Sequence, residues 1–294
     1  MTINKQYINR FRKVLDYIDQ QLFQDIQLVD LCEVAAFSKF HFHRQFSAIF
    51  GISVFRYIQM KKLKRASYQL AFREHLSITD IALESGYENA ESFTRAFKKT
   101  LGQTPSEFRE KPLWNSWLQF KQHTNLTTGI DMLELDNEQN IQIDVIEFPE
   151  TSVAVLEHRG SPHLLGDTIR HFIQWRREHN LSPKVSDTYN LVYDNPEQVA
   201  DEDFRFDLCV SIQGPLPAND LGILSKTIPP GLCARVRHTG SDDQLGRKVE
   251  YLYSKWLPRS DYQVRDFPLF FHRVSFFPEV PEHEMITDIY LPLQ

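Results

Sequence analysis

The sequence predicts two domains of different fold class: an all-α N-terminal domain and an α+β C-terminal domain. Three observations predict this division. Helical periodicity without strand-like alternation runs to about residue 110, period-two alternation follows Ile141, and each part contains its own internal repeat. A chain of 294 residues, 41% hydrophobic and 24% charged, is long enough for two folded domains. We expect the domains at residues 1–112 and 141–294, joined by a linker at residues 113–140.

Short helices are predicted throughout the first 112 residues. An apolar stripe with helical spacing opens the chain and consists of Tyr7, Ile8, Phe11, Val14, Leu15, Ile18 and Leu22. The helical pattern is then interrupted at Gly51, Gly86 and Gly102. Thr104 and Glu107 form a capping box around Pro105, which predicts a further helix over residues 105–110.

The N-terminal domain contains a repeated unit. Residues 31–37 (LCEVAAF) align with residues 81–87 (IALESGY) at an offset of 50, and after one inserted residue Arg44 aligns with Arg95. Each copy is predicted to form a short helix, a tight turn and a longer helix, with Gly86 at the second turn. This arrangement predicts two helix-turn-helix units, because a chance repeat would not keep arginine, phenylalanine and glycine in register.

The longer helix of each unit is the predicted DNA-binding element, since phenylalanines fill its inner face and its outer face is left for a partner. We assign DNA contacts to Lys39, Phe40, His43 and Arg44 in the first unit and to Asn89, Glu91, Ser92 and Arg95 in the second. Arginine and histidine donate hydrogen bonds to base edges and phosphates. Additional contacts with the DNA backbone are predicted for Lys62, Lys64 and Arg65. For any single side chain, an ordinary solvated helix face is the alternative.

The charge distribution favours the same assignment. The formal net charge is −6, which by itself argues against a nucleic-acid partner. Residues 1–112 nevertheless carry 17 Lys and Arg against 12 Asp and Glu, whereas the remaining residues carry 16 against 27. A basic first part and an acidic remainder indicate that only the first part meets phosphate.

The C-terminal domain is predicted to consist of two similar halves. Residues 204–212 alternate apolar with polar side chains, as a strand does, and helical stripes cover residues 169–179 and 245–256. Residues 149–161 align with residues 229–241 at a constant offset of 80. Each copy fits a β-α-β-β unit that does not bury both faces of its strands alone. We therefore expect two pseudo-symmetric β-α-β-β repeats that pair about a pseudo-twofold axis.

A small-molecule site is expected between these two halves. Aromatic side chains are the candidates for its walls, together with one arginine. The candidate ligand-binding residues are Trp175, Tyr193, Trp256, Phe271, Arg273 and Tyr290. Ordinary core or surface packing is the alternative for each of them.

The first domain resembles the AraC/XylS type of transcription regulator over residues 5–110. The resemblance is carried by Ile78-x-x-Ile81-Ala82-x-x-x-Gly86-Tyr87 and by Phe93-x-Arg95-x-Phe97-Lys98-Lys99-x-x-Gly102-x-Thr104-Pro105-x-x-Phe108-Arg109. It implies seven helices, with a long helix near residues 54–72 that joins two recognition helices in adjacent major grooves, ~34 Å apart. Val54, Ala90 and Glu91 depart from the residues that relatives often have, so the target sequence is not implied.

The second domain resembles the GyrI-like effector-binding domain. The resemblance is carried by Pro149–Ser161, Phe204–Cys209, Trp256-Leu257-Pro258 and Thr287–Pro292, and it implies binding of a small, often amphipathic or cationic molecule. Relatives that bind cations carry a buried glutamate where this chain has Phe271. A desolvated cation needs a carboxylate or an aromatic face. We therefore expect a neutral or anionic aromatic effector here, with His272 and Arg273 favouring an anion.

These features together predict a sequence-specific DNA-binding transcription regulator that senses a small molecule, with promoter DNA and the effector as partners. Two alternatives remain open. In the first, the GyrI-like domain hydrolyses a small compound with His158 and His238 as bases, although no paired nucleophile is evident. In the second, the acidic domain docks on a protein such as RNA polymerase.

Other classes of site are not predicted. Cys32, Cys209 and Cys233 are scattered without a CxxC pair, so we expect neither a zinc site nor a disulfide framework, and no cofactor. No stretch reaches the ~18 apolar residues that span a membrane. The N-terminus lacks the apolar core of a signal peptide, so we expect a cytoplasmic protein without a membrane partner.

Overall fold

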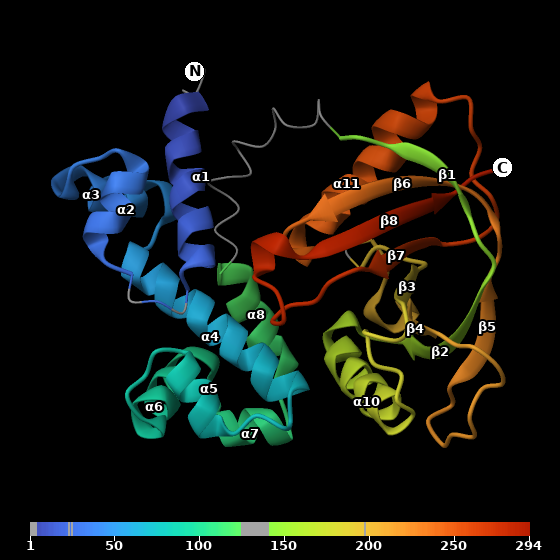
Figure 1. Cartoon of the computed structure of the whole chain (residues 1–294), viewed down its shortest axis with the longest axis horizontal. Helices are drawn as coiled ribbons and strands as arrows, with labels where there is room; N and C mark the ends of the chain where they lie inside the picture. Colours follow the sequence, from blue (N-terminus) through green and yellow to red (C-terminus); the bar gives the residue numbers. More distant parts are fainter. Residues whose placement is uncertain (1–4, 23, 25, 125–140, 197) are drawn as a thin grey trace. The chain divides into compact units, whose positions relative to one another are not determined.

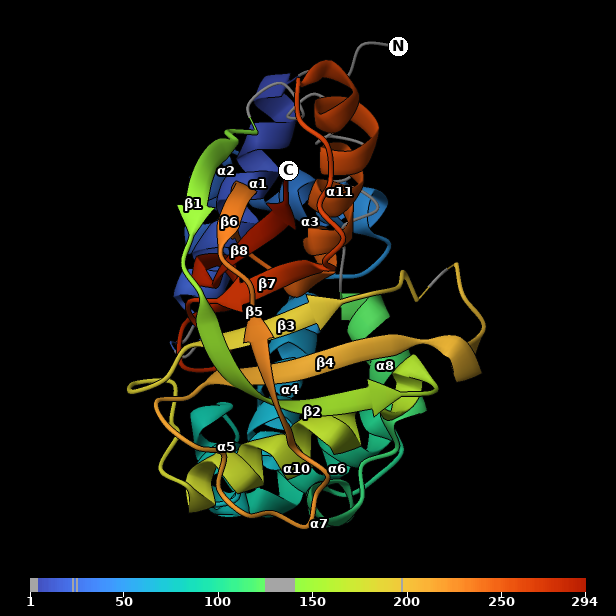
Figure 2. The same cartoon turned by 90° about the vertical axis from the view of Figure 1, so that its right-hand side faces the viewer.

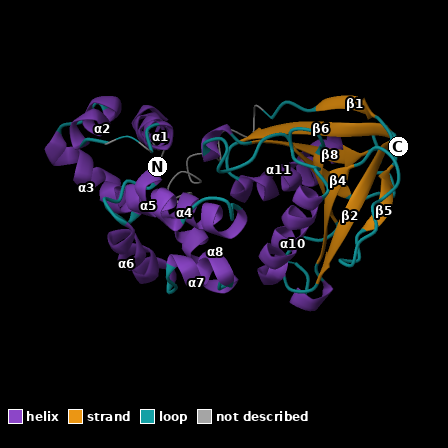
Figure 3. Cartoon of the chain, turned by 60° about the horizontal axis from the view of Figure 1, so that its bottom comes forward, coloured by secondary structure: helices purple, strands orange, loops and turns teal. Residues whose placement is uncertain are grey.

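The computed structural model describes residues 5–22, 24, 26–124, 141–196 and 198–294 (Figure 1). The chain divides into two compact units. Unit 1 comprises Met1–Gln139 together with Pro281–His283, and unit 2 comprises Asn140–Val280 and Glu284–Gln294. Unit 1 is helical and unit 2 combines an antiparallel sheet with helices, which confirms the predicted fold classes (Figure 3). None of the described helices is both long and apolar enough to cross a membrane.

Seven helices lie between Lys5 and Glu110 in the described part of unit 1, as the resemblance implied. They are α1 (Lys5–Gln20), α2 (Leu28–Ala35), α3 (Lys39–Phe50), α4 (Val54–Phe72), α5 (Ile78–Glu84), α6 (Ala90–Leu101) and α7 (Pro105–Glu110). The sequence sets several of their starts. The side chains of Ser53, Ser77 and Thr104 accept a hydrogen bond from a backbone N–H of the first turn of α4, α5 and α7, respectively.

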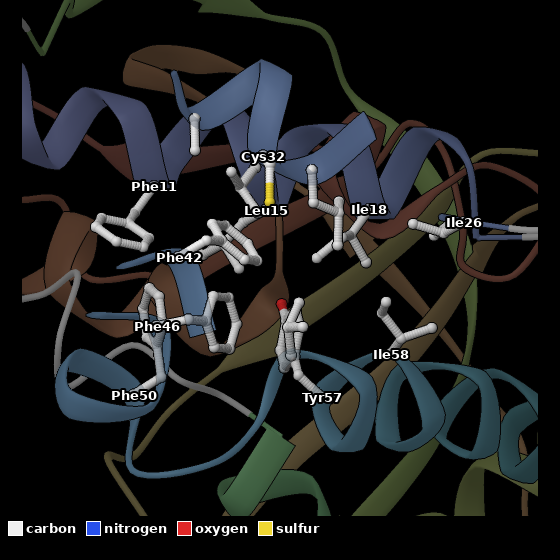
Figure 4. Packing of buried hydrophobic residues seen from close by; sticks show 14 of the residues in the cluster. Phe11, Leu15, Ile18, Ile26, Cys32, Phe42, Phe46, Phe50, Tyr57 and Ile58 are labelled. Atoms are coloured by element: carbon white, nitrogen blue, oxygen red, sulfur yellow. The ribbon is translucent and has the colours of Figure 1, made fainter. Parts of the chain in front are cut away.

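Two separate hydrophobic cores hold the seven helices together. The first core lies among α1, α2, α3 and the start of α4, and includes Phe11, Phe42 and Phe46 (Figure 4). The second lies among the rest of α4, α5, α6 and α7, and includes Phe93 and Phe97. Helix α4 contributes buried residues to both cores, so it holds the α2–α3 pair and the α5–α6 pair at its two ends (Figure 1).

The turn between the helices of each pair has the same backbone conformation with different residues. Ala36 ends α2 with a φ of 51°, and Gly86 follows α5 with a φ of 79°. The left-handed region costs little for glycine but about 1–2 kcal/mol for a residue with a Cβ. The first turn therefore stores strain that the second turn does not.

An eighth helix, α8 (Trp114–Thr124), lies within the segment expected to be a linker. Trp114, Trp117 and Phe120 are buried in the second core, and the Trp117 indole N–H donates to the Ser67 hydroxyl at 2.8 Å. These residues extend the helical unit beyond residue 112. The remainder of the expected linker, residues 125–140, lies outside the described residues.

Unit 2 is built on one eight-stranded antiparallel sheet with the order β1-β6-β8-β7-β3-β4-β2-β5. The strands are β1 (Asp144–Phe148), β2 (Thr151–Arg159), β3 (Thr188–Val192), β4 (Arg205–Ser211), β5 (Leu224–Ile228), β6 (Gly231–Thr239), β7 (Leu269–Arg273) and β8 (Ile286–Pro292). Figure 2 shows that the sheet is strongly curled. The three cysteines, of which Cys32 lies in unit 1 and Cys209 and Cys233 lie in this sheet, are buried and form no disulfide bond.

Two helices cover one face of this sheet (Figure 3). They are α10 (Leu165–Glu178) and α11 (Leu245–Tyr251), the latter continued by a π-helical turn at Leu252–Trp256. Cross-strand partners on this helix-covered face form one continuous row: Leu156, Leu208, Asn190, Phe271, Ile289 and Val236. The residues of this row pack beneath α10 at one end and beneath α11 at the other.

The opposite face of the sheet encloses its own core as the strands curl. Phe148, Tyr189, Cys209, Phe270 and Tyr290 are buried there against one another. Side chains alternate between the two faces along each strand, so neighbours in sequence belong to different cores. Phe270 therefore lies in this enclosed core, while Phe271 lies under the helices.

Candidate functional sites

Helices α3 and α6 each present an inner apolar face and an outer polar face. Phe42 and Phe46 of α3 are fully buried, as are Phe93 and Phe97 at the equivalent positions of α6. An aromatic pair spaced by four residues lies on one side of a helix, and this fixes the rotation of the helix about its axis. The opposite side of each helix is therefore left facing solvent.

The outer face of α3 carries the predicted DNA-contacting residues of the first unit. Lys39, Phe40 and Arg44 are exposed, and His43 is half-buried with its ring 5.9 Å from that of Phe55. Phe40 is 87% exposed, an unusual state for a phenylalanine on a folded helix. Its ring is available to a partner and contributes little to the core.

The outer face of α6 carries the second set. Glu91 and Arg95 are exposed, and Ser92 is half-buried. Asn89 is the N-cap of α6, where its side-chain oxygen accepts the Ser92 backbone N–H at 2.9 Å. This hydrogen bond holds the start of α6, so the Asn89 oxygen already has a structural role, while Arg44 and Arg95 have no side-chain partner among the described residues.

The basic residues of α4 differ from expectation at one position. Lys64 is only 1% exposed, and its Nζ lies 2.6 Å from Oε1 of Glu282. A buried lysine with a carboxylate partner is not available to phosphate, so the predicted DNA contact of Lys64 is wrong. Lys62 and Arg65 are half-buried, and their predicted contacts stay predictions.

The six predicted ligand-binding residues lie on two faces of the sheet. Phe271 and Arg273 of β7 lie on the helix-covered face, where Trp175 of α10 and Trp256 of the π-helical turn also pack. Tyr193 and Tyr290 belong to the core enclosed by the opposite face. The structure therefore brings four of the six to one side of the sheet and separates the two tyrosines from them.

The two tyrosines have structural partners in that enclosed core. The Tyr193 hydroxyl donates to Oδ2 of the fully buried Asp207 at 2.9 Å. Burial raises the pKa of Tyr193 to about 12, with the hydrogen bond to Asp207 adding to the effect. Tyr290 stacks on Phe270 with 5.0 Å between ring centroids. These contacts account for both side chains without a ligand.

Arg273, the last residue of β7, lies on the helix-covered face and already has several hydrogen-bond partners. Its Nε donates to the side-chain oxygen of Asn190 at 2.9 Å, and its Nη1 donates to the Asp242 carboxylate and the Thr287 hydroxyl. Its guanidinium lies 5.3 Å from the Phe271 ring centroid. The Asp242 carboxylate balances the positive charge that predicted an anionic effector.

Asn190 and Asp242 were not singled out from the sequence, although Asn190 had a detectable signal. It is 5% exposed in the mostly apolar stretch Thr188–Val192, and most buried side-chain amides have a hydrogen-bond partner. Asp242 carried no such signal, because its pairing with Arg273 depends on the fold.

The histidines of the second repeat bind their own turns. His158 and His238 each have Nε2 near the carbonyl oxygen of the serine three residues later, Ser161 at 3.1 Å and Ser241 at 2.8 Å. Because a carbonyl only accepts, each Nε2 carries the proton in these contacts. Burial lowers the pKa of His238. Both rings thus support the turns that lead into α10 and α11.

No group of three or more His, Cys, Asp or Glu suited to a metal ion occurs among the residues that the structure describes.

Comparison with known proteins gives two matching family models and several relatives. The GyrI-like small molecule binding domain matches residues 141–294, and a helix-turn-helix domain matches residues 31–111. The chain is 38% identical over 154 residues to the probable transcriptional regulator YgiV of Escherichia coli (strain K12), covering 52% of this chain and 96% of that protein. It is 39% identical over 103 residues to the uncharacterized HTH-type transcriptional regulator YbfP of Bacillus subtilis (strain 168), 35% of each chain. It is also 32% identical over 106 residues to the right origin-binding protein of Escherichia coli (strain K12), 36% of each chain.

Proposed function

Because this chain belongs to the GyrI-like small-molecule binding family and carries an AraC-type helix-turn-helix domain ahead of it, we propose that a small effector controls how α3 and α6 bind promoter DNA. The combination of these two domains is that of a DNA-binding transcription regulator, and relatives of both parts bear that name. Effector control requires that the effector bind more tightly to one DNA-binding state than to the other.

For the DNA interface we propose the outer faces of α3 and α6. The observation that carries this proposal is the repeated arginine. Arg44 and Arg95 occupy equivalent positions of two helices, both are exposed, and neither has a side-chain partner among the described residues. Lys39, Phe40 and His43 would contact the first half-site, and Glu91 and Ser92 the second. Asn89 would act chiefly by capping α6.

Selection from a random duplex pool with the full chain tests this interface. We expect an enriched sequence with two half-sites about one helical turn apart. Arg44→Ala and Arg95→Ala should each weaken binding to that duplex by roughly 1–3 kcal/mol, at different half-sites. Lys13→Ala is the matched control, because it removes an exposed positive charge from α1. No enriched sequence, or equal losses in all three variants, would exclude the proposed interface.

For the sensor we propose that unit 2 consists of two pseudo-symmetric halves. The strand order supports this proposal, because β7 and β3 lie side by side at its centre and the outer strands follow in matching order on each side. The row of cross-strand partners places Asn190 of one half beside Phe271 of the other, on the helix-covered face. A ligand held there would contact both halves at once.

For the effector we propose a neutral aromatic molecule that contacts Phe271 and the stacked Arg273. Balance of the Arg273 charge by Asp242 supports a neutral effector over an anionic one. Thermal-shift measurements with neutral, anionic and cationic aromatic compounds test the class, and Phe271→Leu should reduce any shift. Phe271→Glu restores the carboxylate of cation-binding relatives and should favour cations. An unchanged ligand profile in both variants would exclude this site.

We also propose that the chain has no enzymatic role, because the relatives of its C-terminal part are named transcriptional regulators and both turn histidines are engaged by backbone carbonyls. Any compound that stabilises the protein should be recovered unchanged after prolonged incubation. Conversion of that compound, lost in His158→Gln or His238→Gln, would favour the hydrolase instead.

A further inference from the structure

Three residues far along the chain belong to the helical unit. Unit 1 includes Pro281–His283, whereas the residues on both sides of this segment belong to unit 2. The segment lies in the connection between β7 and β8, the same strands that carry Phe271, Arg273 and Tyr290. A short piece of chain from the sensor sequence is therefore an integral part of the DNA-binding unit.

The segment is held by a buried cluster of four charges. Oε2 of Glu282 lies 2.8 Å from Lys61 Nζ, and Oε1 lies 2.6 Å from Lys64 Nζ. Lys61 Nζ also lies 3.0 Å from Oδ1 of Asp19 in α1. The four side chains are only 9% (Lys61), 2% (Lys64), 14% (Asp19) and 10% (Glu282) exposed. Among these four residues, two positive charges face two negative charges, so loss of the Glu282 carboxylate would leave an excess of positive charge among the other three.

The electrostatics of this cluster favour the ionised carboxylate. Burial alone would raise the pKa of Glu282, but the positive charges of Lys61 and Lys64 outweigh burial and hold it well below the usual value. Burial likewise opposes the charge of Lys61, and Asp19 and Glu282 reverse this effect so that the Lys61 pKa is raised. Removing one partner of such a cluster leaves a buried charge without full compensation, which is far more costly than loss of a surface ion pair.

The neighbouring residue, His283, has an electrostatic effect on α1. Burial raises the pKa of Asp16 in α1, and the charge of His283 opposes this effect. Glu282 thus contacts two lysines of α4, while the charge of His283 acts on the pKa of Asp16 in α1. The two short contacts that buried Glu282 makes with Lys61 and Lys64 indicate a specific position for this segment.

We propose that Pro281–His283 is a latch, in which Glu282 ties the β7–β8 connection to the middle of α4. Helix α4 joins the two helix pairs that contain the proposed recognition helices, α3 and α6. A change in the position of Glu282 would therefore act on the element that sets the distance between them. Conversely, DNA binding that restrains α4 would also restrain the latch and the adjacent ends of β7 and β8. This proposal rests on the proposed function, because it needs the reading helices to bind DNA.

Hydrogen–deuterium exchange on the full chain, with and without the selected duplex, tests the latch. The informative amides are Val274, Ser275 and Ile286, which are hydrogen-bonded between the strand ends next to the latch. In the wild type we expect the duplex to slow their exchange by about tenfold or more. In Glu282→Gln this slowing should fall below about twofold, whereas the exposed control Glu284→Gln should behave as the wild type.

The outcomes separate the latch from a simple structural ion pair and from the proposed function. Equal slowing in the wild type and in Glu282→Gln would overturn the latch, as would no slowing in a wild type that binds duplex. If Glu282→Gln does not fold, Glu282→Asp keeps the charge but shortens the side chain by one methylene. It should give intermediate slowing, and full slowing would overturn the latch. A wild type that binds no duplex at all overturns the proposed function first.

Discussion

The two faces of α3 predict opposite consequences for two phenylalanines that are two residues apart. Phe42→Ala should unfold the protein more easily, and Phe40→Ala should weaken DNA binding with little effect on folding. Phe42 is fully buried, with its ring centroid 5.9 Å from that of Phe46 and 6.5 Å from that of Phe11. Phe40 is 87% exposed on the other side of the same helix.

The burial of each ring sets the expected magnitudes. Truncation of a buried phenylalanine removes its transfer free energy and leaves a cavity, so Phe42→Ala should cost about 3–5 kcal/mol in the free energy of unfolding. An exposed side chain has neither term, and Phe40→Ala should change that free energy by less than about 0.5 kcal/mol. If duplex DNA covers about half of the Phe40 ring, its loss costs ~1 kcal/mol of binding, roughly fivefold in Kd.

Urea unfolding followed by circular dichroism gives the first quantity, and fluorescence anisotropy with the selected duplex gives the second. Both variants are measured as full chains in the same buffer, because DNA affinity depends steeply on salt. The reasoning would be refuted if Phe40→Ala lost as much unfolding free energy as Phe42→Ala, or if its affinity for the duplex equalled that of the wild type.

Three further predictions concern the helical unit. Ala36→Gly should raise the free energy of unfolding by about 0.5–1 kcal/mol in urea, because glycine adopts the left-handed turn conformation without strain; a lower urea midpoint would contradict this. The Thr104 backbone N–H, followed by its hydroxyl, lowers the pKa of Glu107, so this carboxylate stabilises the fold above ~pH 4.3 and ceases to do so as the pH falls through the lowered value. The difference in thermal midpoint between wild type and Glu107→Ala should therefore shrink from pH 7 to about pH 3, and a constant difference would count against it. Arg44→Ala and Arg95→Ala should each reduce the slope of log affinity against log salt by about 0.9 if the arginine contacts a phosphate, and leave it unchanged if it contacts only bases.

The helical unit was largely predictable because its signals are local. Caps at Ser77 and Thr104 and an aromatic pair spaced by four residues are visible within one turn of sequence, and each fixes a helix start or the buried face of a helix. The internal repeat then transferred the assignment from the second unit to the first. The repeat does not extend to the residue at the first turn, where Ala36 has the positive φ that Gly86 has at the second.

The sensor site was less predictable because it depends on register between distant strands. Alternation shows that Phe270 and Phe271 face opposite sides, but only the pairing of β7 with β3 and β8 shows which side the helices cover. The sequence therefore assigned Tyr290 and Phe271 to one site, although the two residues lie on opposite faces of the sheet. The burial of Lys64 was the hardest feature to predict, since the carboxylate that pairs with it is 218 residues away in sequence.

In the proposed mechanism, helix α4 connects these observations. Its 19 residues rise about 28 Å along the axis, somewhat less than the ~34 Å between equivalent points of successive major grooves. Because its two ends are buried in different cores, a tilt of α4 would move α3 and α6 in opposite senses. In the proposed complex, the DNA would absorb any mismatch in spacing, at a cost that depends on its sequence. Glu282 binds α4 at Lys61 and Lys64, close to its midpoint, so the proposed latch would act on the helix that lies between α3 and α6.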